Sequence, residues 1–176
     1  KDNGSADDNK ELVLPENYSF DKQPAKTIMD FLKWYRDHMN IQTGLVNNSN
    51  GDTHDSTKFY TVNFEATENY LSVLKSTEFI SDRYVEKWRG YFKKCDKDFR
   101  DNPTNDGPPD GFEYDFIMLS QEYDEDLENL EKSKIVSQSE LANNATIRIH
   151  FPNGNKLIYI LSKYEGHWRI DDIVRE

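Results

Sequence analysis

The sequence predicts an α+β fold, with N-terminal helices packed on one face of a curved antiparallel sheet formed by the C-terminal third of the chain. Helix-type patterns come first and strand-type patterns follow, so the two do not alternate as a parallel sheet requires. Pro152-Asn153-Gly154 supplies the proline and glycine of a three-residue hairpin loop, and Glu165-Gly166 forms a second tight turn. These turns make residues 144–176 a three-stranded meander.

The two turns also fix which residues lie opposite one another. Side chains alternate between the two faces of a strand, so a shift of one residue would exchange the faces. The predicted pairs are Phe151 with Asn155, Ile149 with Leu157, Ile147 with Tyr159, Tyr164 with His167, and Leu161 with Ile170. One apolar face results, made of Ile147, Ile149, Leu157, Tyr159, Leu161, Trp168 and Ile170. The opposite face carries Arg148, His150, Lys156, Arg169 and Asp171 around Ile158 and Ile160.

Amphipathic patterns predict three helices before the meander. Apolar residues recur at steps of three and four, as on one face of a helix. The helices are expected at about Pro24 to Asn40, Thr67 to Lys75 and Thr77 to Asp98. Residues 101–115 have the composition of a loop, and residues 135–141 regain strand character. Cys95 lies on the apolar stripe of the third helix, which favours a core residue over a nucleophile.

Composition limits the classes of partner. The chain has 176 residues and a formal charge of −11 at pH 7, which disfavours binding to nucleic acid or to an anionic membrane surface. We expect no transmembrane segment, because no stretch approaches about 20 consecutive apolar residues. A single cysteine cannot form an internal disulfide, and a chain of this length can bury a core without one. The 13% of aromatic residues predicts an aromatic-rich core.

The N-terminal segment differs in character from the rest. Residues 1–15 are expected to form a flexible polar tether and a short arm at Leu12 to Pro15, followed by a single domain at residues 16–176. The chain begins at Lys1 rather than at Met, so we expect that a leader was removed. The acidic tether resembles the segment behind the lipidated cysteine of many bacterial lipoproteins. A lipid anchor in the precursor and a periplasmic or cell-surface location are therefore expected.

Four segments together resemble a known superfamily. They are the helix AKTIMDFLKWYRDHM, the helix FISDRYVEKWRGYF, the middle segment FIMLSQEYDEDLENLEKSKIV and the closing HWRIDDIVRE. The chain from Pro24 to Glu176 resembles the nuclear transport factor 2-like, cystatin-like α+β superfamily, and within it uncharacterised secreted or lipid-anchored bacterial proteins. The resemblance implies a cone of helices and curved sheet whose mouth holds a small molecule, and often a dimer. It implies no particular reaction, since the superfamily includes both enzymes and binding modules.

Motifs of the common catalytic classes are absent from the sequence. It contains no G-x-S-x-G, H-E-x-x-H, phosphate-binding glycine loop or paired-cysteine motif. Asp30, Asp37 and His38 could act as a pocket acid or base, but their positions on the first helix favour a solvated face. The acids of the 101–115 loop and of residues 122–131 favour an acidic surface over a metal site. We therefore expect no metal and no cofactor.

Two groups of residues are candidates for binding. The aromatic residues Trp34, Tyr35, Trp88, Tyr91, Tyr159 and Trp168 could line a pocket between the helices and the inner sheet face. Arg148, His150, Lys156, Ile158, Ile160 and Arg169 could form a partner surface, or a homodimer contact, on the outer face. Three interpretations follow: a non-catalytic module that binds a small ligand or protein, an enzyme that uses a pocket acid or base for proton transfer or hydrolysis, and an inhibitory or structural dimer.

Overall fold

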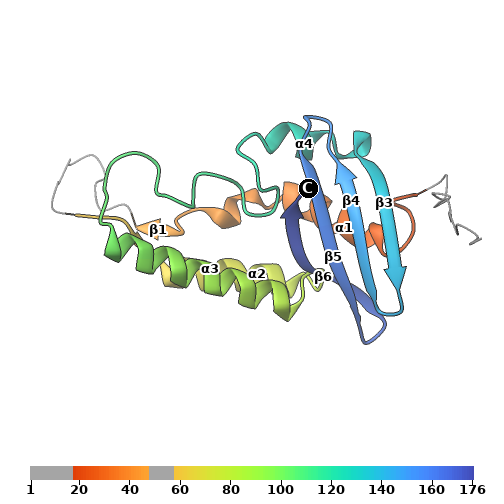
Figure 1. Cartoon of the computed structure of the whole chain (residues 1–176), viewed down its shortest axis with the longest axis horizontal. Helices are drawn as coiled ribbons and strands as arrows, with labels where there is room; N and C mark the ends of the chain where they lie inside the picture. Colours follow the sequence, from red (N-terminus) through yellow and green to blue (C-terminus); the bar gives the residue numbers. More distant parts are fainter. Residues whose placement is uncertain (1–17, 48–57) are drawn as a thin grey trace, which may run out of the picture.

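The computed structural model describes residues 18–47 and 58–176 and has the α+β architecture that the sequence predicts (Figure 1). Four strands form one antiparallel sheet in the order β3-β4-β5-β6. The strands span Lys134–Leu141, Asn144–His150, Lys156–Tyr164 and His167–Arg175. Helix α1 (Ala25–Arg36) crosses behind this sheet, and the short helix α4 (Asp124–Glu128) lies at one end of it.

The predicted register of the meander is confirmed. The strand pairs Ile149–Leu157, Ile147–Tyr159, Leu161–Ile170 and Tyr164–His167 all occur. At the first turn the Phe151 N–H donates to the Asn155 carbonyl at 2.8 Å, and Gly154 adopts a φ of +90°. The seven residues of the predicted apolar face are all buried. Proline and glycine chemistry in the loops therefore determined which side chains enter the core.

A helical hairpin leaves the sheet at its β6 edge. Helix α2 (Phe64–Ser76) packs against α3 (Asp82–Asp101), and both extend away from the strands in Figure 1. The link before α3 pairs with β6 through an isolated parallel bridge between Ile80 and Ile170. Its hydrogen bonds are Ser81 N–H to the Ile170 carbonyl (3.0 Å) and Ile170 N–H to the Phe79 carbonyl (2.7 Å). The sheet thus fixes the root of the hairpin.

The boundaries of the helices differ from those predicted. The third helix begins at Asp82 rather than near Thr77, because Ser81 caps it and the preceding residues are extended along β6. The first helix ends at Arg36 and gives way to the 3₁₀ helix η1 (Met39–Gln42). A second 3₁₀ helix, η3 (Leu130–Lys132), follows α4. Strands β1 (Val46–Asn47) and β2 (Thr61–Val62) pair with each other and were not predicted.

The core joins α1, the helical hairpin and the inner sheet face. Its largest fully buried side chains include Tyr35, Tyr70, Tyr84 and Tyr159 together with several phenylalanines. Cys95 is buried, as its place on the apolar stripe predicted. The expected tether and arm at residues 1–15 lie outside the described residues, and no helix in the described part of the chain is both long and apolar enough to cross a bilayer.

Two glycine substitutions test the local geometry in opposite directions. Gly154→Ala should destabilise the protein by about 1–2 kcal/mol, since the β4–β5 turn needs a positive φ that alanine disfavours. Gly90→Ala should stabilise it by about 0.5–1 kcal/mol, because Gly90 lies inside α3 and a Cβ at this position would enter open space. Urea unfolding at one pH measures both, and effects of the same sign would contradict the described backbone.

Candidate functional site

A buried carboxylate, Asp115, connects segments that are distant in the sequence. One of its oxygens accepts hydrogen bonds from the backbone N–H groups of Ile117 (2.9 Å) and Met118 (2.6 Å). The other accepts from the Gln42 side-chain amide at 2.6 Å and from the Tyr35 hydroxyl. The first pair closes a turn after Asp115, as aspartate does when it caps a helical turn. The second pair fastens that turn to α1 and η1.

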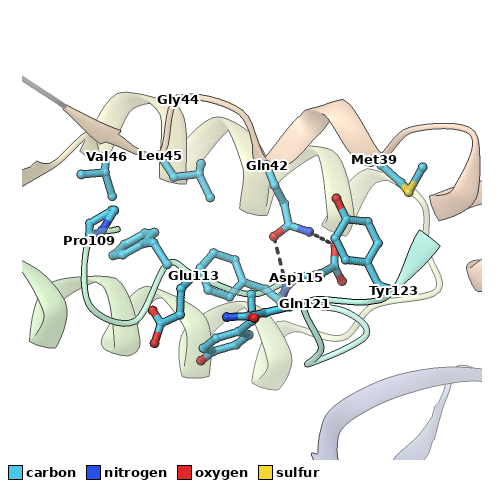
Figure 2. Close-up of a pocket in the computed structure, with 13 residues that line it drawn as sticks. Met39, Gln42, Gly44, Leu45, Val46, Pro109, Glu113, Asp115, Gln121 and Tyr123 are labelled. Atoms are coloured by element: carbon cyan, nitrogen blue, oxygen red, sulfur yellow. Dashed lines mark hydrogen bonds between the residues drawn. The ribbon is translucent and has the colours of Figure 1, made fainter. Parts of the chain in front are cut away.

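Gln42 acts as a strap between the two sides of the site (Figure 2). Its amide nitrogen donates to Asp115 and contacts the Tyr35 hydroxyl, while its amide oxygen accepts from the Phe116 N–H at 3.1 Å. A single side chain from η1 therefore satisfies both the carboxylate and a backbone donor of the loop. Loop and 3₁₀ helix are held at a fixed separation.

Burial and hydrogen bonding act in opposite directions on this carboxylate. Burial raises the pKa of Asp115, and hydrogen bonds from Tyr35, the two backbone N–H groups and Gln42 offset part of that rise. Burial also raises the pKa of Tyr35 well above its usual range, and the neighbouring Asp115 adds to the effect. Tyr35 therefore remains a neutral hydrogen-bond donor at every physiological pH.

The carboxylate lies in the wall of an open groove of about 480 Å³. One wall is the segment from η1 to β1, and the other is the loop after α3, with Leu45 and Val46 opposite Glu113 and Gln121 in Figure 2. The groove has the size of a small-molecule site. It is lined by Met39, Gln42, Gly44, Leu45, Val46, Pro109, Phe112, Glu113, Tyr114, Asp115, Phe116, Gln121 and Tyr123.

Several polar groups at the groove are unpaired. Within the described part of the chain, the structure shows no hydrogen bond for the Glu113 carboxylate, the Gln121 amide or the Tyr123 hydroxyl. Glu113 and Gln121 are exposed, whereas Tyr123 is half-buried. The ring of Tyr114 packs edge-on against Phe116 at 5.5 Å between centroids. Rigid aromatic surface and free polar groups thus occur together.

This arrangement suits binding better than proton transfer. Both oxygens of Asp115 already accept two hydrogen bonds each, so the carboxylate has no free acceptor for a substrate proton. The candidate acids and base of the first helix do not supply a catalytic group at the groove either. Asp30 pairs with Lys26 at 2.5 Å, Asp37 pairs with Arg36, and the exposed His38 ring stacks on Trp34. They occupy a solvated face, as predicted.

The structure distributes the six predicted pocket aromatics over several places. Tyr35 and Tyr159 are fully buried core residues, and Trp34 packs partly buried on the core beside His38. Trp88 and Tyr91 line a smaller hollow of about 290 Å³ between α3 and β6. Trp168 borders a separate hollow of about 520 Å³ near the β5–β6 turn. None of the six lines the described part of the groove beside Asp115, which Tyr35 reaches only through its hydroxyl.

The predicted partner surface lies on one sheet face, with its charges partly paired. Glu176 accepts from His150 at 2.7 Å and lies 3.9 Å from Arg148, whereas Lys156 is exposed. Ile158 is half-buried, and Ile160 keeps 37% of its surface exposed. Arg169 lies over the Tyr164 ring at 6.0 Å. A contact through this face stays a prediction.

One residue of that face was assigned wrongly. Asp171 was expected to be a surface charge among the basic residues, but it is buried. A register shift between β5 and β6 places it as an extra residue, where it accepts hydrogen bonds from Ser162 (2.5 Å) and Tyr164 (2.8 Å) and lies 3.5 Å from Arg83. The strand carries a signal of this bulge, because the buried apolar residues step by two from Trp168 to Ile170 and by three from Ile170 to Ile173.

Sequence reasoning also missed Asp115 and Gln42 as site residues. Asp115 was grouped with the acids of the loop as a weak metal candidate, and no cluster of three metal-binding side chains occurs among residues 18–47 and 58–176. An aspartate directly before the apolar run Phe116 to Leu119 is a capping signal that could have marked it. Nothing in the sequence around Gln42 distinguishes it.

Comparison with protein-family models, with curated proteins and with solved structures finds no match. The resemblance to the nuclear transport factor 2-like superfamily therefore stays a prediction, and function has to be inferred from the site.

The Asp115→Asn variant tests the carboxylate. An amide nitrogen in place of one oxygen cannot accept from Tyr35 and Gln42, so the variant should lose about 1–3 kcal/mol of stability. Asp110→Asn, at an exposed acid of the same loop, should change stability by less than about 0.5 kcal/mol. Urea unfolding of both variants at pH 7 makes the comparison.

The pH dependence of that difference checks the direction of the pKa shift. A raised pKa means that the folded state binds the Asp115 proton more tightly than the unfolded chain does, so this contribution to stability is lost as pH rises. The loss begins near the unfolded value of about 4 and ends above the raised folded pKa. The free energy of unfolding of the parent protein minus that of the Asp115→Asn variant should therefore fall as pH rises. A difference that grows with pH would mean that hydrogen bonding outweighs burial.

Proposed function

We propose that this protein is a non-catalytic binding module, of a secreted or surface-tethered bacterial protein, that holds a small ligand in the groove beside Asp115. The observation that carries the proposal is the contrast between two sets of polar groups. The buried carboxylate is saturated by its own chain, whereas Glu113, Gln121 and Tyr123 make no hydrogen bond among the described residues. The first set holds the walls in place, and the second is free for a ligand.

Preorganised walls favour binding. A ligand that enters a groove of fixed width does not have to order its walls, so less of the contact energy is lost on binding. The Gln42 strap and the Asp115 turn supply this rigidity. A hydrolytic or proton-transfer enzyme would instead need a pocket acid or base with a free lone pair. The only buried carboxyl at the described groove has none.

The proposed location outside the cytoplasm has a different basis. The acidic, polar segment at residues 1–10 is the reason to place the protein there, with an anchor in the precursor. The family resemblance supports the same location. Neither feature indicates which ligand the groove accepts.

A fragment screen by protein-observed NMR tests the proposed site. Amide shifts should cluster at residues 42–46 and 112–123, and Tyr123→Ala should weaken the fragments that bind there by about tenfold through loss of one aromatic wall. Phe64→Ala is the matched control, since Phe64 is an exposed aromatic outside the groove lining. Shifts that cluster elsewhere, or equal effects of the two variants, would rule out this groove as the binding site.

A further inference from the structure

The ionisable side chains at the groove are of one sign. Among the described residues that line it, the carboxyl groups of Glu113 and Asp115 occur without any lysine, arginine or histidine. The smaller hollow between α3 and β6 differs, since Lys87 and Arg175 border it and no acid does. A phosphate or carboxylate ligand would meet no counter-charge in the groove and would also be repelled by a net charge of −11.

The groove also offers aromatic surface to a ligand. Phe112, Tyr114, Phe116 and Tyr123 all line it, and three of the four are only partly buried. The electron-rich faces of such rings attract cations. One of these rings already does so inside the protein, because the Arg175 guanidinium lies over Tyr114 at 5.8 Å. The ring surface that Arg175 does not cover can attract a ligand cation by the same electrostatic effect.

Glu113 is the charge that remains for a ligand. It makes no ion pair within the described part of the chain, and it lies on the loop wall with its carboxylate directed away from Leu45 and Val46 in Figure 2. Asp115 is saturated and deeply buried, so it cannot take this role. A ligand bound along the loop wall would place a positive group near Glu113 and a hydrocarbon part against the aromatic residues of that wall.

We propose that the ligand of this groove is a small organic cation, an alkylated ammonium group on a short apolar or hydroxylated body, held by Glu113 and by the aromatic rings of the lining. This inference rests on the proposed binding function and names its ligand class. The ammonium charge is only partly desolvated at an exposed carboxylate, so the affinity of a small probe falls in the millimolar range.

Choline and its neutral isostere 3,3-dimethylbutan-1-ol form a matched pair of probes. They differ in the charge of one atom and little in shape. In NMR titrations of the full chain, choline should shift the amide signals of residues 112–123 and should bind at least about fivefold more tightly than the alcohol. Glu113→Gln should reduce choline affinity by a similar factor. Glu128→Gln, at an exposed acid of α4 outside the groove, should leave it unchanged.

The outcomes separate the ligand class from the binding function. Equal binding of the two probes at residues 112–123 would overturn the proposal of a cationic ligand but would keep the groove as a binding site. The same conclusion follows if neither probe binds there but neutral or anionic fragments do. If neither the probes nor any fragment shifts these signals, both proposals fail. If Glu113→Gln and Glu128→Gln lose the same choline affinity, the effect comes from the overall charge of the protein. The assigned role of Glu113 would then be overturned.

Discussion

The position of the groove depends on one buried carboxylate. Asp115 takes two hydrogen bonds from its own loop and two from side chains of α1 and η1, so three chain segments share a single polar centre. An unpaired charge in this environment would cost several kcal/mol, which leaves the loop few other positions. Both walls of the groove are attached to this centre. The width of the groove is thus a property of the hydrogen-bond geometry rather than of packing alone.

The fold and the site differ in how far the sequence predicts them. Pairs such as Ile149 with Leu157 follow from local turn chemistry and from alternation along a strand, and both are visible in a short stretch of sequence. Asp115 meets Gln42 across 73 residues and Tyr35 across 80, between segments without a repeating pattern. No periodicity links such residues. Asp171 illustrates a third case, because a single extra residue in β6 changed the surroundings of a side chain whose strand was predicted correctly.

Several buried tyrosine hydroxyls place polar atoms inside the core around the carboxylate. The hydroxyls of Tyr70, Tyr84 and Tyr159 are buried without a hydrogen-bond partner in the described structure, and burial is the largest cause that raises the pKa of each. Asp115 raises these pKa values further, at Tyr70 after the larger effects of Tyr84 and Tyr35. Aromatic rings fill much of the volume of this core. Their unpaired hydroxyls reduce the net stabilisation that this burial provides. The rigidity of the groove therefore comes from hydrogen bonds made at Asp115, beside a core that is less well satisfied.

The bridge between Ile80 and Ile170 has a consequence for assembly. A terminal strand with free backbone groups can pair with a strand of another molecule, and repeated pairing at both ends of a sheet produces fibres. Here the link to α3 occupies β6 at that position, and α3 packs along the same strand. The other terminal strand is β3. A strand of another copy that approached the β6 edge could therefore not pair with it at Ile170, so the link to α3 interrupts any continuous ladder along this edge.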